Sequence, residues 1–200
     1  MKIFLDTEFT GLHQNTSLLS IGLVDEDGRT FYAELSDYDF TQMNEWLLEN
    51  VMSHMLFEPA KEGEEEYYNA SRFKDNPIGQ DLYKSYSLNM RGTLNKVKEE
   101  LEKWLSQYDN VEIWSDCLAY DWVLFNHIFG HAFNIPNNVY YIPFDICTVF
   151  KLKDIDPDIS REKFIGDRID NIDLPDMMKH NSLWDAYVIR ECYNKLMQDN

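Results

Sequence analysis

Apolar residues along the chain form short runs separated by polar turns, which is the pattern of strands in a sheet. Five such runs predict strands, over residues 2–6, 18–24, 31–35, 111–115 and 139–143. An Asp-Glu-Asp-Gly turn follows the second run. The first three strands are therefore expected to form an antiparallel meander.

Elsewhere, apolar residues recur every three or four positions, which is the spacing of one helical face. This spacing predicts helices over residues 41–56, 93–108, 121–129 and 182–196, and a short helix over residues 144–150. Three meandering strands followed by two strands that alternate with helices indicate an α/β protein, with a mixed five-stranded sheet flanked by helices.

Two stretches do not follow these patterns. Residues 58–90 contain an acidic run, two prolines and several tyrosines, so we interpret them as an insertion into a single domain of residues 1–200. The charged residues 153–173 predict a mobile loop. Four tyrosines of the insertion favour an interface, and on this basis we expect a homodimer: Tyr67, Tyr68, Tyr83 and Tyr86.

Composition narrows the class of protein. Hydrophobic residues make up 44% and aromatic residues 14% of the chain, which is typical of a folded domain. Three cysteines without a C-x-x-C spacing predict neither a disulfide framework nor a cysteine-rich zinc site. No signal-like segment opens the chain, and no apolar run approaches the roughly 18 residues of a membrane span. We therefore expect a cytoplasmic protein with no membrane segment.

The net charge of −18 argues against extended contacts with nucleic acid, because proteins that bind polyanions usually carry excess lysine and arginine. Acids that hold divalent cations change this argument, since the bound ions are then the largest local charges. A short or single-stranded nucleic-acid end remains compatible with the charge.

The first candidate site is the pair Asp6 and Glu8 at the end of the first predicted strand. Residues two apart on a strand lie on the same face, so both carboxylates can meet one site. The alternative is that both are solvated surface charges, because a single D-x-E is a weak motif.

The second candidate is His180 with Asp185, at the start of the last predicted helix. A histidine has a pKa suited to proton transfer near neutral pH. The alternative for Asp185 is a capping box with Ser182, in which its carboxylate would satisfy an amide at the helix start. Both roles can coexist.

The third candidate is Asp121, an acid flanked by apolar and aromatic residues after a predicted strand. A buried carboxylate needs a partner, a helix amide or a metal ion. Asp121 therefore either caps a helix or contributes to a site. Asp116 and Asp145 compete for the same role.

In their joint order, D-x-E, Asp121 and H-x-x-x-x-D resemble the DEDDh 3′-to-5′ exonucleases, which include oligoribonucleases and polymerase proofreading domains. The resemblance spans Asp6 to Asp185 and includes LDTEFTGL, residues 5–12. NEWLLENV and the small acidic chain are similar to the RNase AS-type exoribonucleases. In place of a histidine or asparagine often found before the third acid, this sequence has Asp116 and Cys117.

The resemblance implies a ribonuclease H-like fold and hydrolysis of single-stranded RNA or RNA overhangs from the 3′ end, releasing nucleoside 5′-monophosphates. It also implies two Mg²⁺ or Mn²⁺ ions per site, in keeping with the preference of hard cations for oxygen ligands. Asp6 would bridge the ions, Glu8 and Asp185 would hold the ion on the nucleophile's side, and Asp121 would complete the cage. Glu8 and His180 would be catalytic, with His180 taking a proton from the attacking water.

Residues near these acids are candidates for substrate contacts. Phe9 and Leu12 can stack on or wedge between terminal bases, or pack in the core. Three basic residues before His180 can hold phosphates or form a solvated surface: Arg161, Lys163 and Arg168.

Two other functions fit the same residues. A DNA-directed exonuclease of the proofreading or repair type would share the catalytic acids and differ in how the 2′-hydroxyl is read. An acidic binding module without catalysis would use the acids as surface charge. Competition between RNA and DNA distinguishes the first alternative, and Mn²⁺ titration distinguishes the second.

Overall fold

The structure is a computed structural model that describes residues 1–57, 67–68, 87–172, 174 and 178–198. One mixed sheet of seven strands forms its centre, in the order β4-β5-β3-β2-β1-β6-β7. The strands are β1 (Lys2–Phe9), β2 (Leu18–Asp25), β3 (Thr30–Leu35), β4 (Tyr67–Tyr68), β5 (Leu88–Gly92), β6 (Glu112–Ser115) and β7 (Phe144–Asp145).

Strand directions match the predicted arrangement. β1, β2 and β3 form an antiparallel meander, β6 runs parallel to β1, and β7 runs parallel to β6. The predicted α/β class with a mixed, ribonuclease H-like sheet is therefore confirmed. The sheet is larger than the predicted five strands because β5 pairs in parallel with the free edge of β3, and β4 pairs with β5.

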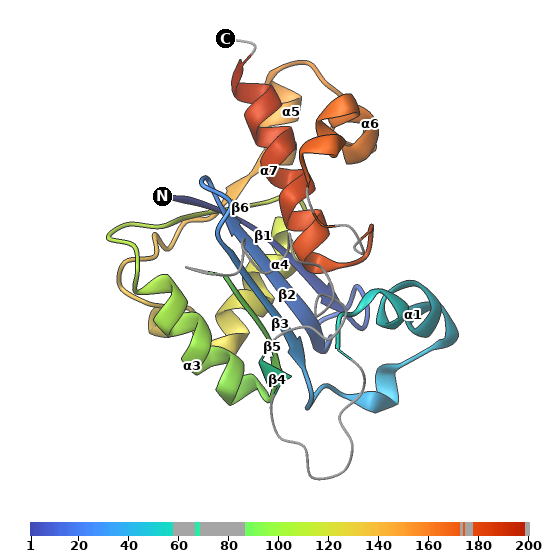
Figure 1. Ribbon diagram of the computed structural model, residues 1–200, viewed down its shortest axis with the longest axis vertical. Coiled ribbons are helices and arrows are strands. Elements are labelled where there is room, and N and C mark those ends of the chain that lie inside the picture. The colour runs from blue at the N-terminus through green and yellow to red at the C-terminus, as the bar shows by residue number, and fades with distance from the viewer. Residues whose placement is uncertain (58–66, 69–86, 173, 175–177, 199–200) are drawn as a thin grey trace.

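Helices cover both faces of the sheet. The α-helices are α1 (Glu45–Asn50), α3 (Leu94–Leu105), α4 (Leu118–Ile128), α5 (Ile146–Leu152), α6 (Arg161–Ile165) and α7 (Ser182–Gln198). Four short 3-10 helices are also described: η1 (Phe40–Gln42), η2 (Met52–His54), η4 (Ala132–Asn134) and η5 (Gly166–Asn171). Figure 1 shows α7 crossing the middle of the sheet on one face, with α3 and α4 on the other.

Side-chain alternation along β1 explains the two layers. Ile3 and Leu5 are fully buried in the core that includes α3 and α4, whereas Phe4 is buried in the core beneath α7. Asp6 and Glu8 continue the Phe4 series, because every second residue of a strand points to the same face. The acids of β1 are thus directed toward the start of α7.

Three predictions of local structure need correction. The predicted helix 41–56 is divided into η1, α1 and η2, and Asn44 caps α1 by accepting the amide of Leu47 at 2.9 Å. The predicted loop 153–173 contains α6 and η5. The fifth strand, predicted at 139–143, is the two-residue β7, preceded by a single bridge from Val139 to Val111. Most of the predicted insertion 58–90 lies outside the described residues.

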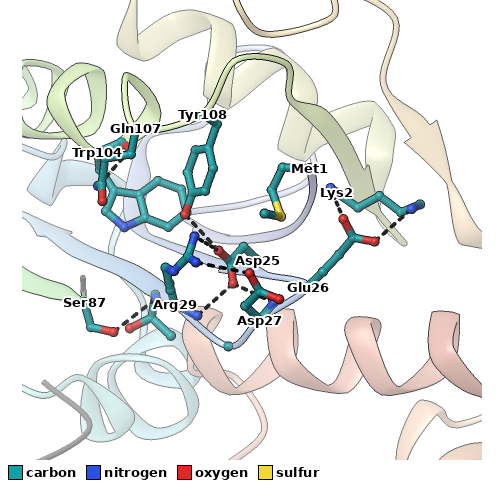
Figure 2. A network of polar contacts seen from close by, with 12 residues as sticks. Met1, Lys2, Asp25, Glu26, Asp27, Arg29, Ser87, Trp104, Gln107 and Tyr108 are labelled. Atoms are coloured by element: carbon teal, nitrogen blue, oxygen red, sulfur yellow. Dashed lines mark hydrogen bonds and ion pairs between the residues drawn. The ribbon is translucent and has the colours of Figure 1, made fainter. Parts of the chain in front are cut away.

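The turn between β2 and β3 is closed by a polar network around Asp25 (Figure 2). The buried Asp25 carboxylate accepts the amides of Asp27 and Arg29 at 2.9 and 2.8 Å, and the hydroxyl of Tyr108 at 3.0 Å. Asp25 pairs with Ile3, at the opposite end of β1 from Asp6. This network stabilises the meander and lies away from the acids.

None of the described helices is both long enough and apolar enough to cross a membrane.

Candidate active site

Three parts of the chain meet at the carboxyl end of β1. Strand β1 supplies Asp6 and Glu8, the segment from the end of β6 into α4 supplies Asp116 and Asp121, and the turn before α7 supplies His180, followed by Asp185 in its first turn. A cavity of about 430 Å³ opens here, lined by Asp6, Glu8, Asp116, His180 and Asp185 among others. All five predicted acid and histidine residues therefore lie in or directly beside one cavity.

The atoms that could coordinate a metal ion fall into two groups, and within each group they lie within 4.8 Å of one another. One group is Asp6, Asp116 and Asp121, and the other is Glu8, His180 and Asp185. Carboxylate oxygens dominate both groups, which is the donor set that Mg²⁺ and Mn²⁺ prefer. The register between β1 and β2 shifts between Glu8 and Phe9, so the strand is irregular where it presents the acids.

Asp121 is fully buried beneath the cavity and is held by two hydroxyl groups. The Thr7 hydroxyl donates to one carboxylate oxygen at 2.6 Å, and the Ser115 hydroxyl donates to the other. Asp121 lies in the first turn of α4, but these side chains, rather than helix amides, account for its hydrogen bonds. The competitor Asp145 instead caps α5 by accepting the amides of Cys147 and Thr148, and it belongs to neither acid group.

Asp185 combines a position in the acid group with a structural contact. Its carboxylate accepts the amide of His180 at 2.8 Å. The predicted capping box, in which Ser182 is the cap, does not form. The cap is Asn181, whose side chain accepts the amides of Leu183 and Trp184 at 3.1 and 3.3 Å. Asp185 therefore fixes the turn before the helix, while Asn181 caps it.

His180 is half-buried in a turn and has a φ of 69°. This left-handed conformation is uncommon for a residue with a side chain. Burial, together with the nearby Lys179 and His54, lowers the pKa of His180 below its usual value. The Trp46 ring of α1 meets the imidazole edge-on, with centroids 5.5 Å apart. The imidazole is thus neutral near pH 7 and able to accept a proton.

Burial dominates the electrostatics of the acids. It raises the pKa of Asp6 well above its usual range, and the nearby Asp121 and Asp185 carboxylates add to this. Burial and repulsion from Asp185 and Asp121 raise the pKa of Glu8 to about 8. Burial also raises the pKa of both Asp121 and Asp185 to about 7. Carboxylates packed so closely lack sufficient positive charge, and a divalent cation would supply it.

Two cations line the cavity among the described residues, Arg161 and Lys179. The Arg161 guanidinium bonds the Asp116 carboxylate at 2.9 Å and also donates to the carbonyls of Pro157 and Ile159. The hydrogen-bond donors of Arg161 are thus directed at groups of the protein itself. Lys163 and Arg168 are not among the described lining residues, so neither is placed to hold a phosphate within the cavity.

Phe9 and Leu12 differ in their surroundings. Phe9 lines the cavity, is half-buried and stacks on Tyr120, with ring centroids 5.3 Å apart. Leu12 is 72% exposed, so the alternative that it packs in the core is wrong.

The sequence motifs did not identify several residues that lie at this site. Glu162 and Lys179 line the cavity, and Trp46 contacts His180. Asp116 was considered only as a competitor of Asp121, yet both join Asp6 in one group. Asp116 directly follows β6 in the sequence, and this position was the signal that could have identified it as a site residue. Trp46 and Glu162 reach the site only through tertiary packing.

A mixed sheet of this topology, with acids at the end of β1, defines the chain as a protein of the ribonuclease H-like class. Residues 1–197 match the family model described as "3'-5' exoribonuclease Rv2179c-like domain", and the chain belongs to this family.

Two curated relatives come from Mycobacterium tuberculosis. They are the 3'-5' exoribonuclease MT2234.1 of strain CDC 1551 / Oshkosh and the 3'-5' exoribonuclease Rv2179c of strain ATCC 25618 / H37Rv. Each is 26% identical to this chain over 141 residues, which is 70% of this chain and 67% of the relative. The protein is accordingly a 3′-to-5′ exoribonuclease, a hydrolase that acts on ester bonds, and the family implies an RNA substrate.

Proposed function

We propose that this site removes nucleoside 5′-monophosphates one at a time from the 3′ end of single-stranded RNA or RNA overhangs, with two Mg²⁺ or Mn²⁺ ions per site. The observation that carries the proposal is the presence of two groups of candidate metal ligands at the end of β1, one containing Asp6 and the other containing Glu8. Bound divalent ions lower the pKa of a water molecule and offset negative charge on the phosphate and the leaving oxygen.

Each acid of the site is assigned a role in metal binding. Asp6, central to the acids, would bridge the two ions, with Glu8 and Asp185 as ligands on the nucleophile's side and Asp121 completing the cage. Asp116 is a further candidate ligand beside Asp121. Its ion pair with Arg161 would compete with a cation, so we assign it the secondary role.

His180 would accept a proton from the attacking water at an imidazole nitrogen. Two observations support this role: the lowered pKa of His180 keeps the ring neutral at pH 7, and His180 forms one group with Glu8 and Asp185. General bases of this kind contribute roughly 10²–10⁴-fold to rate.

Phe9 and Leu12 would contact the terminal bases. Phe9 lines the cavity and Leu12 is largely exposed, and both follow the acids directly on the chain. Apolar side chains beside a site, whether half-buried like Phe9 or exposed like Leu12, can provide stacking or wedging surfaces for unpaired bases.

Two further proposals concern the cellular location and the oligomeric state of the enzyme. The three cysteines are free, which fits a reducing cytoplasm. The homodimer remains our proposal, since Tyr83 and Tyr86 lie outside the described residues and Tyr67 and Tyr68 are described only as the strand β4.

The roles of the acids are tested with Asp6→Asn and His180→Ala, assayed on a labelled single-stranded RNA with Mn²⁺. We expect Asp6→Asn to reduce cleavage below detection, and His180→Ala to lower kcat by roughly 10²–10⁴-fold. Asp145→Asn is the matched control. Its carboxylate lies outside both ligand groups and caps α5, so activity should stay within about threefold of wild type, as for substitutions away from a site. Substantial cleavage by Asp6→Asn would refute the metal assignment.

The DNA-directed alternative is tested with RNA and DNA oligonucleotides of one sequence. The family relationship favours RNA, and a 2′-hydroxyl is the feature that distinguishes the two. Faster removal of deoxynucleotides in direct competition would favour the alternative.

A further inference from the structure

A buried polar chain beneath the His180 turn takes no part in the chemistry proposed above. Tyr32 and Glu34 lie two residues apart on β3, and both are fully buried. They therefore point to the same face of the sheet, where Tyr32 packs with Leu183 at the start of α7. A carboxylate in such a place requires hydrogen-bond partners.

Glu34 finds its partners in β3 and in the segment after η2. One carboxylate oxygen accepts the Tyr32 hydroxyl at 2.8 Å and the amides of Leu56 and Phe57 at 2.6 and 3.2 Å. Since both amides belong to one segment, Glu34 fixes the backbone of residues 56–57 against the sheet.

Asn181 connects the same region to the active-site turn. Its side chain is buried, and its amide nitrogen donates to the His54 carbonyl at 2.9 Å and toward the Tyr32 hydroxyl at 3.4 Å. Its oxygen accepts the amides of Leu183 and Trp184. One side chain thus ties the start of α7 to the segment that Glu34 holds.

His180 immediately precedes this anchor. Its left-handed backbone conformation persists only where the surroundings impose it. The His180 amide is held by Asp185 on one side, and Asn181 is held by His54 and Tyr32 on the other. Hydrogen bonds thus hold both the His180 amide and the next residue, Asn181.

We propose that Asn181 is a positioning residue for His180, which it holds in place by joining the turn to the His54 carbonyl and the buried Tyr32–Glu34 pair. This inference rests on the proposed role of His180 as the general base. Asn181 lies too deep in the protein to contact RNA, so any effect on catalysis must pass through its neighbours.

The variant Asn181→Ser separates the two functions of the side chain. A serine oxygen can still cap the helix, but its short side chain cannot donate to the His54 carbonyl. We expect kcat to fall about tenfold or more, because small displacements of a catalytic group are costly. KM and the Kd for Mn²⁺ should change less than about threefold, since the acids themselves are untouched.

A double-mutant cycle distinguishes positioning from general stability. If Asn181 acts through His180, the substitution should change kcat less than about twofold in a His180→Ala background. A loss of similar size in both backgrounds would overturn the proposal, and so would wild-type kcat in Asn181→Ser. Full activity of His180→Ala alone would instead overturn the general-base role on which the proposal rests.

Tyr32→Phe provides a second route if Asn181→Ser does not fold. It removes the hydroxyl that joins Glu34 to Asn181, and Tyr108→Phe is its matched control. Tyr108 also donates a buried hydroxyl to a carboxylate, that of Asp25, at the far end of the meander (Figure 2). The proposal predicts a lower kcat for Tyr32→Phe alone, which disappears in the His180→Ala background. Equal kcat values for the two tyrosine variants would contradict it.

Discussion

Glu8, Asp121 and Asp185 have pKa values raised to about 8, 7 and 7, because each carboxyl group is buried among other acids. In the unfolded chain the same groups titrate near pH 4. Between these values the folded protein retains protons that the unfolded chain has released. The stability contributed by the protonated acids is therefore complete below about pH 4 and is lost as the pH rises through 7 to 8.

In the presence of chelator, we expect the temperature of the thermal unfolding midpoint to decrease as the pH is raised from 5.5 to 8. The lowered pKa of His180 acts in the opposite direction, but it is one group against several acids. Mn²⁺ competes with the protons, so its stabilising effect should be larger at pH 8. Thermal unfolding at both pH values, with and without Mn²⁺, checks this.

Glu34→Gln serves as a control for that experiment. Burial raises the pKa of Glu34 to about 7, but this acid lies outside both ligand groups. Its substitution should flatten the pH dependence without changing the increment due to Mn²⁺. A Mn²⁺ increment equal at both pH values would contradict the assignment of the acids.

At the residue scale, the sequence identified the acids whose spacing follows a simple period. Asp6 and Glu8 share a strand face, and His180 and Asp185 flank a helix start, so local geometry was enough to group each pair. Asp121 needed the resemblance to a family. Asn181 and Glu34 carry no motif, because their roles arise from contacts between segments far apart in the chain.

At the element scale, the packing of α7 on β2 decides where Asp185 lies. Gly22 of β2 pairs with Asp6 in the sheet, and the backbone of α7 crosses directly over it. A Cβ atom added to Gly22 would lie 2.3 Å from the backbone of Ser182. Backbone cannot yield as a flexible side chain can, so only glycine permits this close approach.

Gly22→Ala should destabilise the protein by about 1–3 kcal/mol, the usual cost of overpacking, and should displace Asp185. We expect a lower thermal midpoint together with weaker Mn²⁺ binding. Gly92→Ala in β5 of the same sheet is the matched control, because its new Cβ would meet only side-chain atoms at 3.3 Å or more. Equal midpoints and Mn²⁺ affinities for the two variants would show that the α7 contact is not critical.

Elements with strong periodicity were predicted within a few residues, as for α3 and α7. Weaker elements depend on their partners. The strand β5 is short and has a mixed sequence, and it pairs with β3 along its length. The helix α6 had local signals, since Ser160 caps it and Gly166 ends it with a φ of 58°, but the surrounding charges favoured a loop.

At the scale of the whole molecule, the topology brings together two segments that lie far apart in the sequence. Asp6 lies near the amino terminus and Asp185 near the carboxyl terminus, and they meet because α7 packs across β1 and β2 (Figure 1). The order of the motifs therefore allowed the active site to be inferred, whereas the distances and the cavity could not be.

The net charge of −18 also acts at this scale. The described cavity has two lining cations, and the Arg161 donors are directed at the protein. Under the proposed function, attraction of RNA would come mainly from bound divalent ions and from stacking. Such a surface suits a short single-stranded end rather than a long duplex.

The most direct measurement is the digestion of one short single-stranded RNA, labelled at its 5′ end in one sample and at its 3′ end in another, with Mn²⁺. Wild-type enzyme should release the 3′ label first, as a nucleoside 5′-monophosphate, while the 5′ label stays on fragments that shorten by one nucleotide at a time. Chelator or Asp6→Asn should abolish both patterns. Release of the 5′ label first, or an unchanged pattern with Asp6→Asn, would contradict the assignment of this site to metal-dependent 3′-to-5′ cleavage.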